Sequence, residues 1–405
     1  MRDIEGITSP KDGCAPQAAC GCCAVDLDGK AVLSCVTKMS KAADGTVTTT
    51  DGLGEYRQKV YANAFVEKGG VQCGFCIPGI VIQSNALINN NPTPSRADIQ
   101  KALTPHLCRC TGYKKIIDAV QYAAEAIHKE EEIPEPGGNG KGPVGTRLPK
   151  YKAQDLVLGF HNYVDDIKME GMVYGALRFS DHPRARVLKI DTSAAEKMAG
   201  VIRVVTGADV PGERTIGLIK QDWPLMVIEG EITRYIGDVL AGVVAETEAI
   251  ARQAAALIRV EYEVLEPLTD MHKALDPDAP QIHAAGNKLS RSYTSRGDVA
   301  EARKKSAYIA RSEFETQWIE HGFMETETAV AYPVADGLEV LSQGQGVYDD
   351  RIQIAKLLGW PPGKSARDYG AQWRRFWRQG RLDRARPCRA DGPFVGRARQ
   401  SAPHP

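Results

Sequence analysis

The sequence predicts an α+β protein in which a short β-hairpin region, a bundle of four helices and a mixed α/β domain follow one another. Three observations predict this order. Nine of the ten cysteines lie within the first 110 residues, helical periodicity dominates residues 56–127, and strand-like runs alternate with a helix after a Pro- and Gly-rich stretch. At 405 residues the chain is long enough for two or three packed domains.

The first elements are a hairpin and four helices. Ala24 to Leu27, the Asp28-Gly29 turn and Ala31 to Cys35 have the pattern of a tight β-hairpin, because Asp-Gly accepts the positive φ of a two-residue connection. Ser95 and Asp98 have the spacing of a capping box. Helical patterns are found over residues 56–68, 78–88, 96–103 and 112–127. The last has an apolar face of Ile116, Ile117, Val120, Ala124 and Ile127.

A linker and a second structural region follow. Residues 130–149 combine Pro, Gly and charge without apolar periodicity, which is typical of a linker. Beyond it, strand patterns over residues 172–179, 239–245 and 258–264 flank a helical pattern over 248–257. This alternation predicts a mixed α/β domain.

Bulk composition excludes several classes of protein. No apolar run approaches the roughly 18 residues of a membrane span. The N-terminus is charged where a signal peptide would be apolar. We therefore predict a cytoplasmic protein that does not enter a membrane. Because cysteines stay reduced in the cytoplasm, their clustering indicates metal binding rather than disulfides.

Two groups of cysteines have spacings that suit iron–sulfur clusters. The first group follows C-x5-C-x2-C-x11-C, one residue longer in its first gap than the plant-type ferredoxin pattern, and consists of Cys14, Cys20, Cys23 and Cys35. The second group places one pair before each of two helices, so that a bundle can join the pairs, and consists of Cys73, Cys76, Cys108 and Cys110. Cys22 is left over, and we interpret it as a spare thiol or as a residue that surrounds the ligands without binding the metal.

Zinc is the alternative ligand for the second group, because zinc sites also use two cysteine pairs. A Cys-x-Cys half is nevertheless unusual for zinc. Inert buried thiols are a further alternative, although isolated core cysteines do not gather in loops.

The sequence contains GCAPQAACGCCAVDLDG, VQCGFCIPGI and HLCRCTGYKKI, in that order. Together these motifs resemble the two-cluster iron–sulfur domain of the molybdenum hydroxylases, the xanthine dehydrogenase and aldehyde oxidoreductase family. After the linker, YVDDIKMEGMVYGALRFSDHPRARVLKID and EHGFMETETAVA resemble the first half of the molybdopterin-binding subunit. The resemblance covers residues 2–363.

The resemblance implies a function and its cofactors. Family members hydroxylate a substrate at a molybdenum–molybdopterin centre and pass electrons through two [2Fe-2S] clusters to flavin or an external acceptor. The first cysteine group would bind the outer cluster, and the second group the cluster nearer to molybdenum. Gln72 and Cys110 would contact the pterin, although Gln72 also fits a polar residue beside a helix. Molybdopterin-bearing and FAD-bearing subunits are the expected partners; nucleic acid and membranes are not.

Together the patterns and the resemblance predict five segments. They are a partial plant-type [2Fe-2S] ferredoxin domain with part of a β-grasp fold (1–54), a helical [2Fe-2S]-binding domain (55–129), a linker (130–150), the N-terminal part of the molybdopterin-binding subunit with its a/b hammerhead-like domain (151–363), and an out-of-frame disordered tail (364–405).

Two departures from the family pattern matter. The strands that precede the first cysteine loop in the family are missing, so we expect unpaired hairpin edges. Ile319 stands where the family commonly has Gln, so we assign no molybdenum contact and no catalytic residue there. Glu320, His321 and Glu325 fit a strand end with satisfied polar groups as well as a catalytic role.

The last 42 residues, 364–405, change composition abruptly, with 11 Lys plus Arg against 3 Asp. The family has a Gly-Gly-Gly-Phe-Gly-Gly loop here, followed by a catalytic Glu. Trp373 to Arg378 can be encoded TGG CGG CGG TTT TGG CGG, and reading one base later gives the codons of that loop. We therefore expect a shifted reading frame from about Lys364. A basic, aromatic nucleic-acid patch is the competing interpretation, but the tail lacks the periodicity of a folded platform.

These inferences predict a fragment of a molybdenum-dependent hydroxylase of a purine-like heterocycle or an aldehyde, inactive as a lone chain. The alternative is a stand-alone two-cluster module that transfers electrons for a partner subunit.

Overall fold

The computed structural model describes residues 1–14, 16–137, 144–146, 148–335, 337–344 and 346–361, and the backbone of two short strands, 367–368 and 396–399. The chain forms two compact units. The first contains residues 1–176, 244–251 and those from Gly322 onward, and the second contains residues 177–243 and 252–321. Except for those two strands, the expected disordered tail, 364–405, lies outside the described residues.

The first unit begins with a three-stranded sheet, in the order β2-β1-β3, of β1 (Ala24–Leu27), β2 (Lys30–Leu33) and β3 (Val47–Thr48). Asp28 and Gly29 have φ of 52° and 81°, which confirms the predicted hairpin turn. Two details of the prediction are wrong. The second strand ends at Leu33, with Cys35 in the 3-10 turn η1 (Ser34–Val36), and β3 pairs with the outer edge of β1, which we expected to be unpaired.

Four helices follow, as predicted, with ends shifted by at most two residues: α2 (Glu55–Lys68), α3 (Ile77–Asn90), α4 (Arg96–Ala102) and α5 (Lys114–Lys129). Gly69, with φ of 67°, ends α2, and the Ser95–Asp98 capping box starts α4. The predicted apolar face of α5 is confirmed, since Ile116, Ile117 and Val120 are buried in the main core of the unit. The short helix α1 (Met39–Ala42) and the 3-10 turn η2 (Thr50–Gly52) precede the bundle.

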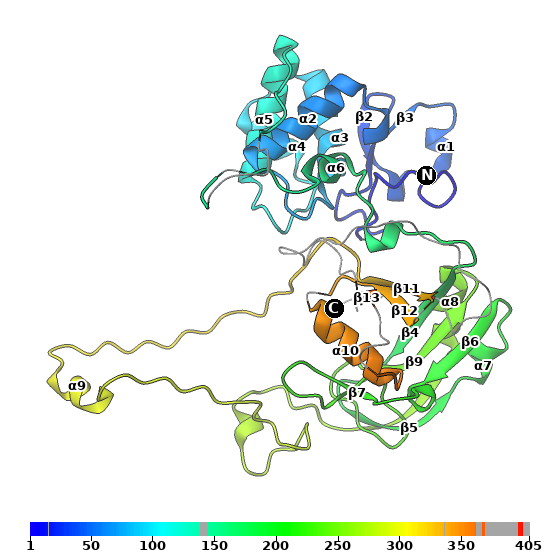
Figure 1. The fold of residues 1–405 in the computed structure, drawn as a ribbon, viewed down its shortest axis with the longest axis vertical. Coiled ribbons are helices and arrows are strands. Elements are labelled where there is room, and N and C mark those ends of the chain that lie inside the picture. The colour runs from blue at the N-terminus through cyan, green and yellow to red at the C-terminus, as the bar shows by residue number, and fades with distance from the viewer. Residues whose placement is uncertain are drawn as a thin grey trace. The chain divides into compact units, whose positions relative to one another are not determined.

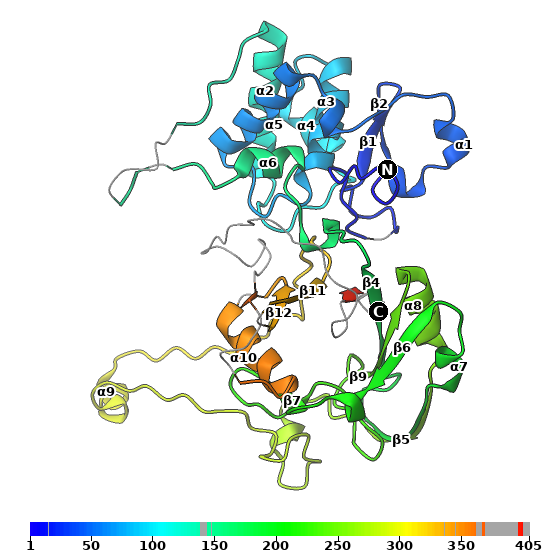
Figure 2. The same cartoon turned by 45° about the vertical axis from the view of Figure 1, so that its right-hand side comes forward.

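The first unit extends beyond the expected linker. The described linker residues, 130–137, 144–146 and 148–149, contain no helix or strand; residues 138–143 and 147 lie outside the description. The next helix, α6 (Ala153–Leu158), contacts α2 and α3, and Figures 1 and 2 both show it beside the bundle. It leads into the 3-10 turn η3 (Val164–Asp166).

The rest of the first unit is a small α/β region. Strand β11 (Thr328–Val334) pairs antiparallel with β12 (Gly337–Leu341), and α10 (Val347–Leu357) follows. Val164, Val330 and Leu341 form its core. The backbone of β14 (Gly396–Arg399) pairs with β11 and with the first residues of β4 (Val173–Phe179), and β13 (Arg367–Asp368) pairs with β12.

The second unit contains most of the predicted α/β pattern. Strand β5 (Ala185–Asp191) pairs antiparallel with β10 (Arg259–Val264) around a core of Val187, Val227 and Leu240. The predicted strands and helix over 172–264 are confirmed as β4, β9 (Val239–Ala245), α8 (Glu248–Leu257) and β10. Shorter elements are α7 (Ser193–Glu196), β6 (Val201–Thr206), η4 (Gly207–Asp209), β7 (Thr215–Ile216), β8 (Trp223–Pro224) and η5 (Lys273–Leu275).

An extended arm, residues 288–321, ends the second unit. Its one helix is α9 (Val299–Lys305), seen in Figure 1 on a long yellow segment. Nearly every residue of the arm is exposed, including the large apolar side chains of Tyr293, Tyr308, Phe314 and Trp318. Among the described residues, none of the helices is long and apolar enough to cross a bilayer.

Candidate metal centres

The second cysteine group converges at one end of the helical bundle, as its spacing predicts. Cys73 and Cys76 lie in the turn between α2 and α3, and Cys108 and Cys110 in the turn between α4 and α5. The Sγ atoms of Cys73 and Cys110 are 3.5 Å apart. The Cys108 thiol interacts with those of Cys76 and Cys110. We call these four residues the inner set.

Polar side chains hold the backbone of the inner set. The Gln72 amide donates to the Cys110 carbonyl over 3.0 Å, so the structure brings the two predicted pterin contacts together. The Cys108 amide donates to the Tyr113 hydroxyl over 2.9 Å, and the Tyr163 hydroxyl donates to the Cys73 carbonyl over 2.7 Å. Sequence reasoning missed both tyrosines. The TGY motif after Cys110 could have indicated Tyr113, whereas no local pattern indicates Tyr163.

The first cysteine group forms two neighbouring pairs. Cys20 interacts with the Cys14 thiol, and Cys35 interacts with the Cys23 thiol. Cys20 and Cys23 are buried, while Cys14 and Cys35 are half-buried. We call these four residues the outer set. Its pairs come from the loop before β1 and from the turn after β2, and not from helix ends.

Neighbouring thiols shift the pKa values in both sets. A hydrogen bond from the Cys22 thiol is the largest cause that lowers the pKa of Cys20 to about 5. A hydrogen bond from Cys110 does the same for Cys108, whose pKa falls to about 2. Burial instead raises the pKa of Cys35 to about 11. Low pKa values favour the thiolate, which is the form that binds metal.

Cys22 is completely buried and lies beside Cys20. Its thiol is within reach of the Cys20 carbonyl oxygen, at 3.9 Å. Burial and the hydrogen bond to Cys20, which is the largest cause, raise the pKa of Cys22 well above its usual range. The interpretation of Cys22 as a spare thiol stays a prediction.

The loops of the two sets pack directly against each other. The backbone N–H of Leu107, next to Cys108, donates to the Cys20 carbonyl over 2.9 Å. Gly21 has φ of 75°, and a Cβ there would lie 2.5 Å from His106 Nδ1 and 2.6 Å from the Pro105 carbonyl oxygen. Only glycine fits such a position without strain. The absence of a side chain at Gly21 therefore lets the two loops touch.

The donor chemistry fits two binuclear clusters. Each [2Fe-2S] cluster is held by four thiolates, and each set offers four cysteines arranged as interacting pairs. Within the described residues, no three His, Cys, Asp or Glu side chains gather closely enough to hold one ion.

The three acidic and histidine residues noted in the sequence differ in their exposure. Glu320 and His321 are exposed, with side chains 86% and 85% accessible, whereas Glu325 is buried. None of the three forms a strand end, because β11 begins only at Thr328. The strand-end interpretation was wrong: the residues before Thr328 form an irregular segment.

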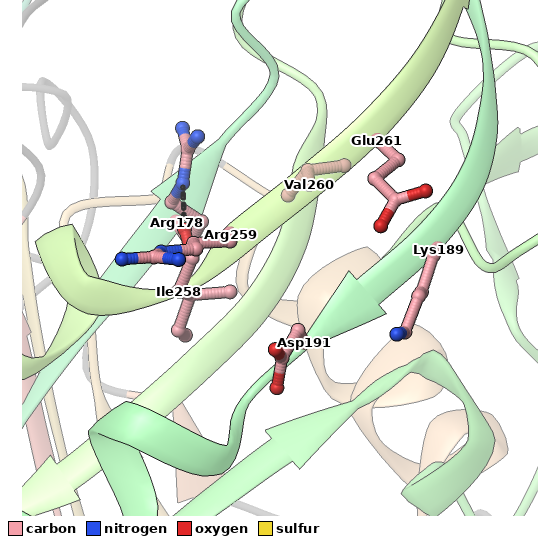
Figure 3. A pocket seen from close by; sticks show the side chains of 7 residues that line it. All are labelled: Arg178, Lys189, Asp191, Ile258, Arg259, Val260 and Glu261. Atoms are coloured by element: carbon pink, nitrogen blue, oxygen red, sulfur yellow. Dashed lines mark hydrogen bonds between the residues drawn. The ribbon is translucent and has the colours of Figure 1, made fainter.

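The second unit has an open hollow of about 500 Å³, lined by residues that Figure 3 labels. Its Arg178 donates from Nε to the Ile258 carbonyl over 3.2 Å and binds both carboxylate oxygens of Asp181. The Arg178 guanidinium therefore makes its hydrogen bonds within the protein. No cysteine lines this hollow.

Family models match three consecutive regions of the chain. A [2Fe-2S] binding domain matches residues 49–121, the a/b hammerhead domain of aldehyde oxidase and xanthine dehydrogenase matches residues 158–266, and a molybdopterin cofactor-binding domain matches residues 282–365. The first match contains the whole inner set.

Similar proteins agree with these matches. Aldehyde oxidoreductase of Megalodesulfovibrio gigas is 34% identical over 89% of this chain and 42% of its own length. The small FeS subunit of nicotinate dehydrogenase from Eubacterium barkeri is 40% identical over 31% of this chain and 80% of its own length. The solved structure of aldehyde oxidoreductase from Desulfovibrio gigas aligns with a TM-score of 0.80 at 32% identity, over 90% of this chain and 42% of that chain.

This chain thus spans about 42% of the length of the aldehyde oxidoreductases that it matches. The iron–sulfur, hammerhead and molybdopterin-binding matches follow one another, and the sequence relatives and the structural relative point the same way. The chain belongs to the molybdenum hydroxylase family of xanthine dehydrogenases and aldehyde oxidoreductases.

Proposed function

We propose that the inner and outer sets each hold one [2Fe-2S] cluster and that the chain carries electrons between a molybdenum centre and an acceptor. The convergence of the inner set is the observation that carries this proposal: four thiols from two helix turns, with Cys73 and Cys110 Sγ atoms 3.5 Å apart. The family match over residues 49–121 supports it. When bound, each cluster accepts and releases one electron at a time.

The outer set rests on different support, because the three family matches begin at residue 49. Its spacing and its two thiol pairs favour a plant-type cluster. The contact between Leu107 and Cys20 brings the two loops together. Electron transfer weakens steeply with distance, so adjoining loops favour transfer from one cluster to the other.

Gln72 and Cys110 are the residues that we propose to contact the pterin. Cys110 is half-buried while Cys73, Cys76 and Cys108 are buried, so it lies at the accessible side of the inner set. The hydrogen bond from Gln72 to the Cys110 carbonyl keeps both residues at that side. No role in bond making is assigned to either residue.

We further propose that a molybdopterin-bearing partner and an FAD-bearing partner complete the system, in the cytoplasm, where the cysteines stay reduced. Several relatives are named as subunits, including nicotinate dehydrogenase large molybdopterin and small FeS subunits. The exposed apolar side chains of the arm, residues 288–321, support a polypeptide partner, which could cover them.

As a lone chain the protein should not turn over substrate. The molybdopterin-domain match ends at residue 365, next to the point where the composition changes and where we place the shifted reading frame. A glycine-rich loop with its catalytic Glu is not encoded in the frame as read. The alternative is a stand-alone electron-transfer module, which needs only the two cysteine sets.

Reduction experiments on the anaerobically purified full chain test these proposals. Dithionite should bleach the visible absorption of the clusters, whereas an aldehyde or a purine, added after incubation with molybdenum cofactor, should not reduce a dye. Substrate-dependent dye reduction would contradict the proposed inactivity. A colourless, iron-free protein would contradict the proposed function. Co-purification with a molybdenum-bearing chain would support the proposed molybdopterin-bearing partner.

A further inference from the structure

Tyr163, which is distant in sequence, contacts the Cys73–Cys76 loop of the inner set. Tyr163 is 2% exposed, and its hydroxyl donates to the Cys73 carbonyl over 2.7 Å. Its ring meets the ring of Phe75 edge-on, with centroids 5.0 Å apart at an angle of 69°. Both partners belong to the Cys73–Cys76 loop. Ninety residues of sequence separate Tyr163 from Cys73.

The Cys73–Cys76 loop packs closely against Leu156 and Tyr163. Gly74 has φ of 89°, and a Cβ there would lie 2.7 Å from Leu156 Cβ and 3.0 Å from the Tyr163 hydroxyl oxygen. A residue with a side chain would be strained and would push the tyrosine away. The contact between Tyr163 and the Cys73 loop is therefore specified from both sides.

A buried ion pair fixes Tyr163 in turn. Its backbone N–H donates to Asp166 Oδ2 over 2.9 Å. The same carboxylate accepts from Lys11 Nζ at 2.9 Å, and its other oxygen lies 2.7 Å from an Arg2 nitrogen. The Lys11 and Asp166 side chains are 0% and 1% exposed. Breaking one partner of such a pair is costly, because it leaves a buried charge uncompensated.

Lys11 of this ion pair also contacts the loop that carries the outer set. The Lys11 backbone N–H donates to the Cys22 carbonyl over 3.1 Å, and its ammonium donates to the carbonyl oxygens of Gly159 and His161, each at 3.2 Å. One buried residue thus connects the loop of the outer set with the segment that carries Tyr163. The Tyr163 hydroxyl itself donates to the inner set, at the Cys73 carbonyl.

We infer that Tyr163 is a positioning residue of the inner cluster, and that its hydroxyl raises the reduction potential of that cluster alone. This inference rests on the proposed function of the inner set. The hydroxyl binds the Cys73 carbonyl, whose negative end would otherwise be unpaired in a buried site beside a ligand. Cluster potentials depend on nearby charge and on solvent exposure as well as on hydrogen bonds to the sulfur atoms, so a hydroxyl dipole on a ligand's own carbonyl should also act on them. Loss of the donor should destabilise the extra electron of the reduced cluster.

The test is a redox titration of the full chain, followed by EPR, in which the two clusters give separate signals. Tyr163→Phe removes the hydroxyl and keeps the ring. We expect the inner-cluster midpoint to move to lower potential, with a changed inner EPR signal, an unchanged outer cluster and unchanged iron content. Tyr56→Phe is the matched control, since its hydroxyl bonds the carbonyls of Ala126 and Glu131, which no cysteine adjoins. It should shift neither cluster.

A second variant separates the hydrogen bond from the ring packing. Phe75→Leu alters the ring contact but keeps the Tyr163 hydroxyl, so it should shift the inner midpoint less than Tyr163→Phe does. If Tyr163→Phe does not accumulate as folded protein, a fluorinated tyrosine at position 163, a stronger donor of the same shape, should move the midpoint upward. If the inner cluster binds normally and its midpoint potential is the same in the wild type and in these variants, this inference alone is wrong. Wild-type protein without an inner cluster would overturn the proposed function as well.

Discussion

The inner and outer sets each consist of four cysteines, but different kinds of backbone structure position them. The inner set comes from the turns of a helical bundle, with three of its four cysteines buried and its carbonyls and amides bound by Gln72, Tyr113 and Tyr163. The outer set comes from an irregular loop and a 3-10 turn, with Cys14 and Cys35 half-buried. All four inner cysteines belong to the main core of the first unit or pack against it, whereas in the outer set only Cys14 and Cys20 do.

This difference teaches where the geometry of a metal site originates. Helices packed in a core place the inner thiols even without a metal, because the core fixes the helix ends. An irregular loop has fewer contacts to hold it, so metal binding has to supply more of its order. We therefore expect the inner cluster to be the more robust of the two.

Loss of one ligand in each set gives the largest effect. Cys110→Ala should remove the inner cluster and Cys14→Ala the outer one, so that each variant loses about half of the iron of the wild type. Iron analysis together with EPR of the reduced protein measures this. A variant that lost all iron would show that the two sets do not bind independently, and one that lost none would remove that cysteine from the ligands.

The close contact between the loops of the two sets can be tested by replacing two glycines that both have a positive φ, Gly21 and Gly29. Gly21→Ala should lower the free energy of unfolding by about 3 kcal/mol, because a left-handed φ and overpacking against His106 add together. Gly29→Ala is the control: its φ is 81°, but a Cβ there would meet no atom within 4 Å. It should cost about 1 kcal/mol. Equal losses in denaturant unfolding would show that the loops do not touch.

Chelator resistance compares the sets in one molecule. Under a ferrous chelator the outer EPR signal should disappear first, because Cys14 and Cys35 are the more accessible ligands of their set. The inner signal should persist for several-fold longer. Simultaneous loss, or loss of the inner signal first, would contradict the idea that the helical scaffold protects its cluster.

The smallest effect is expected at Cys22, the cysteine of this region that belongs to neither set. Cys22→Ala should keep the full iron content and both EPR signals, and lower the free energy of unfolding by about 1 kcal/mol through the small cavity that it leaves. Loss of the outer cluster in this variant would instead make Cys22 a ligand in place of one of its neighbours.

Local patterns in the sequence predicted much of the fold. The Asp28-Gly29 turn, the Ser95–Asp98 capping box and the apolar face of α5 each arise from residues close in sequence, and the structure confirms them. Strand β3 was missed because two residues, Val47 and Thr48, are too short a run to show alternation.

The candidate site was predictable in its ligands but not in their surroundings. Cysteine spacing alone nominated both sets, and the structure brings Cys73 beside Cys110. The bond from Tyr163 to Cys73 and the ion pair of Lys11 with Asp166 join positions 90 and 155 residues apart. Contacts at such separations leave no periodic trace, so only the folded chain reveals them.

The most direct test of the two-cluster account is the metal and sulfide content of anaerobically purified protein. The account predicts about four iron ions and about four acid-labile sulfides per chain, with two distinct EPR signals after reduction. One zinc ion per chain, without sulfide and without an EPR signal, would contradict it.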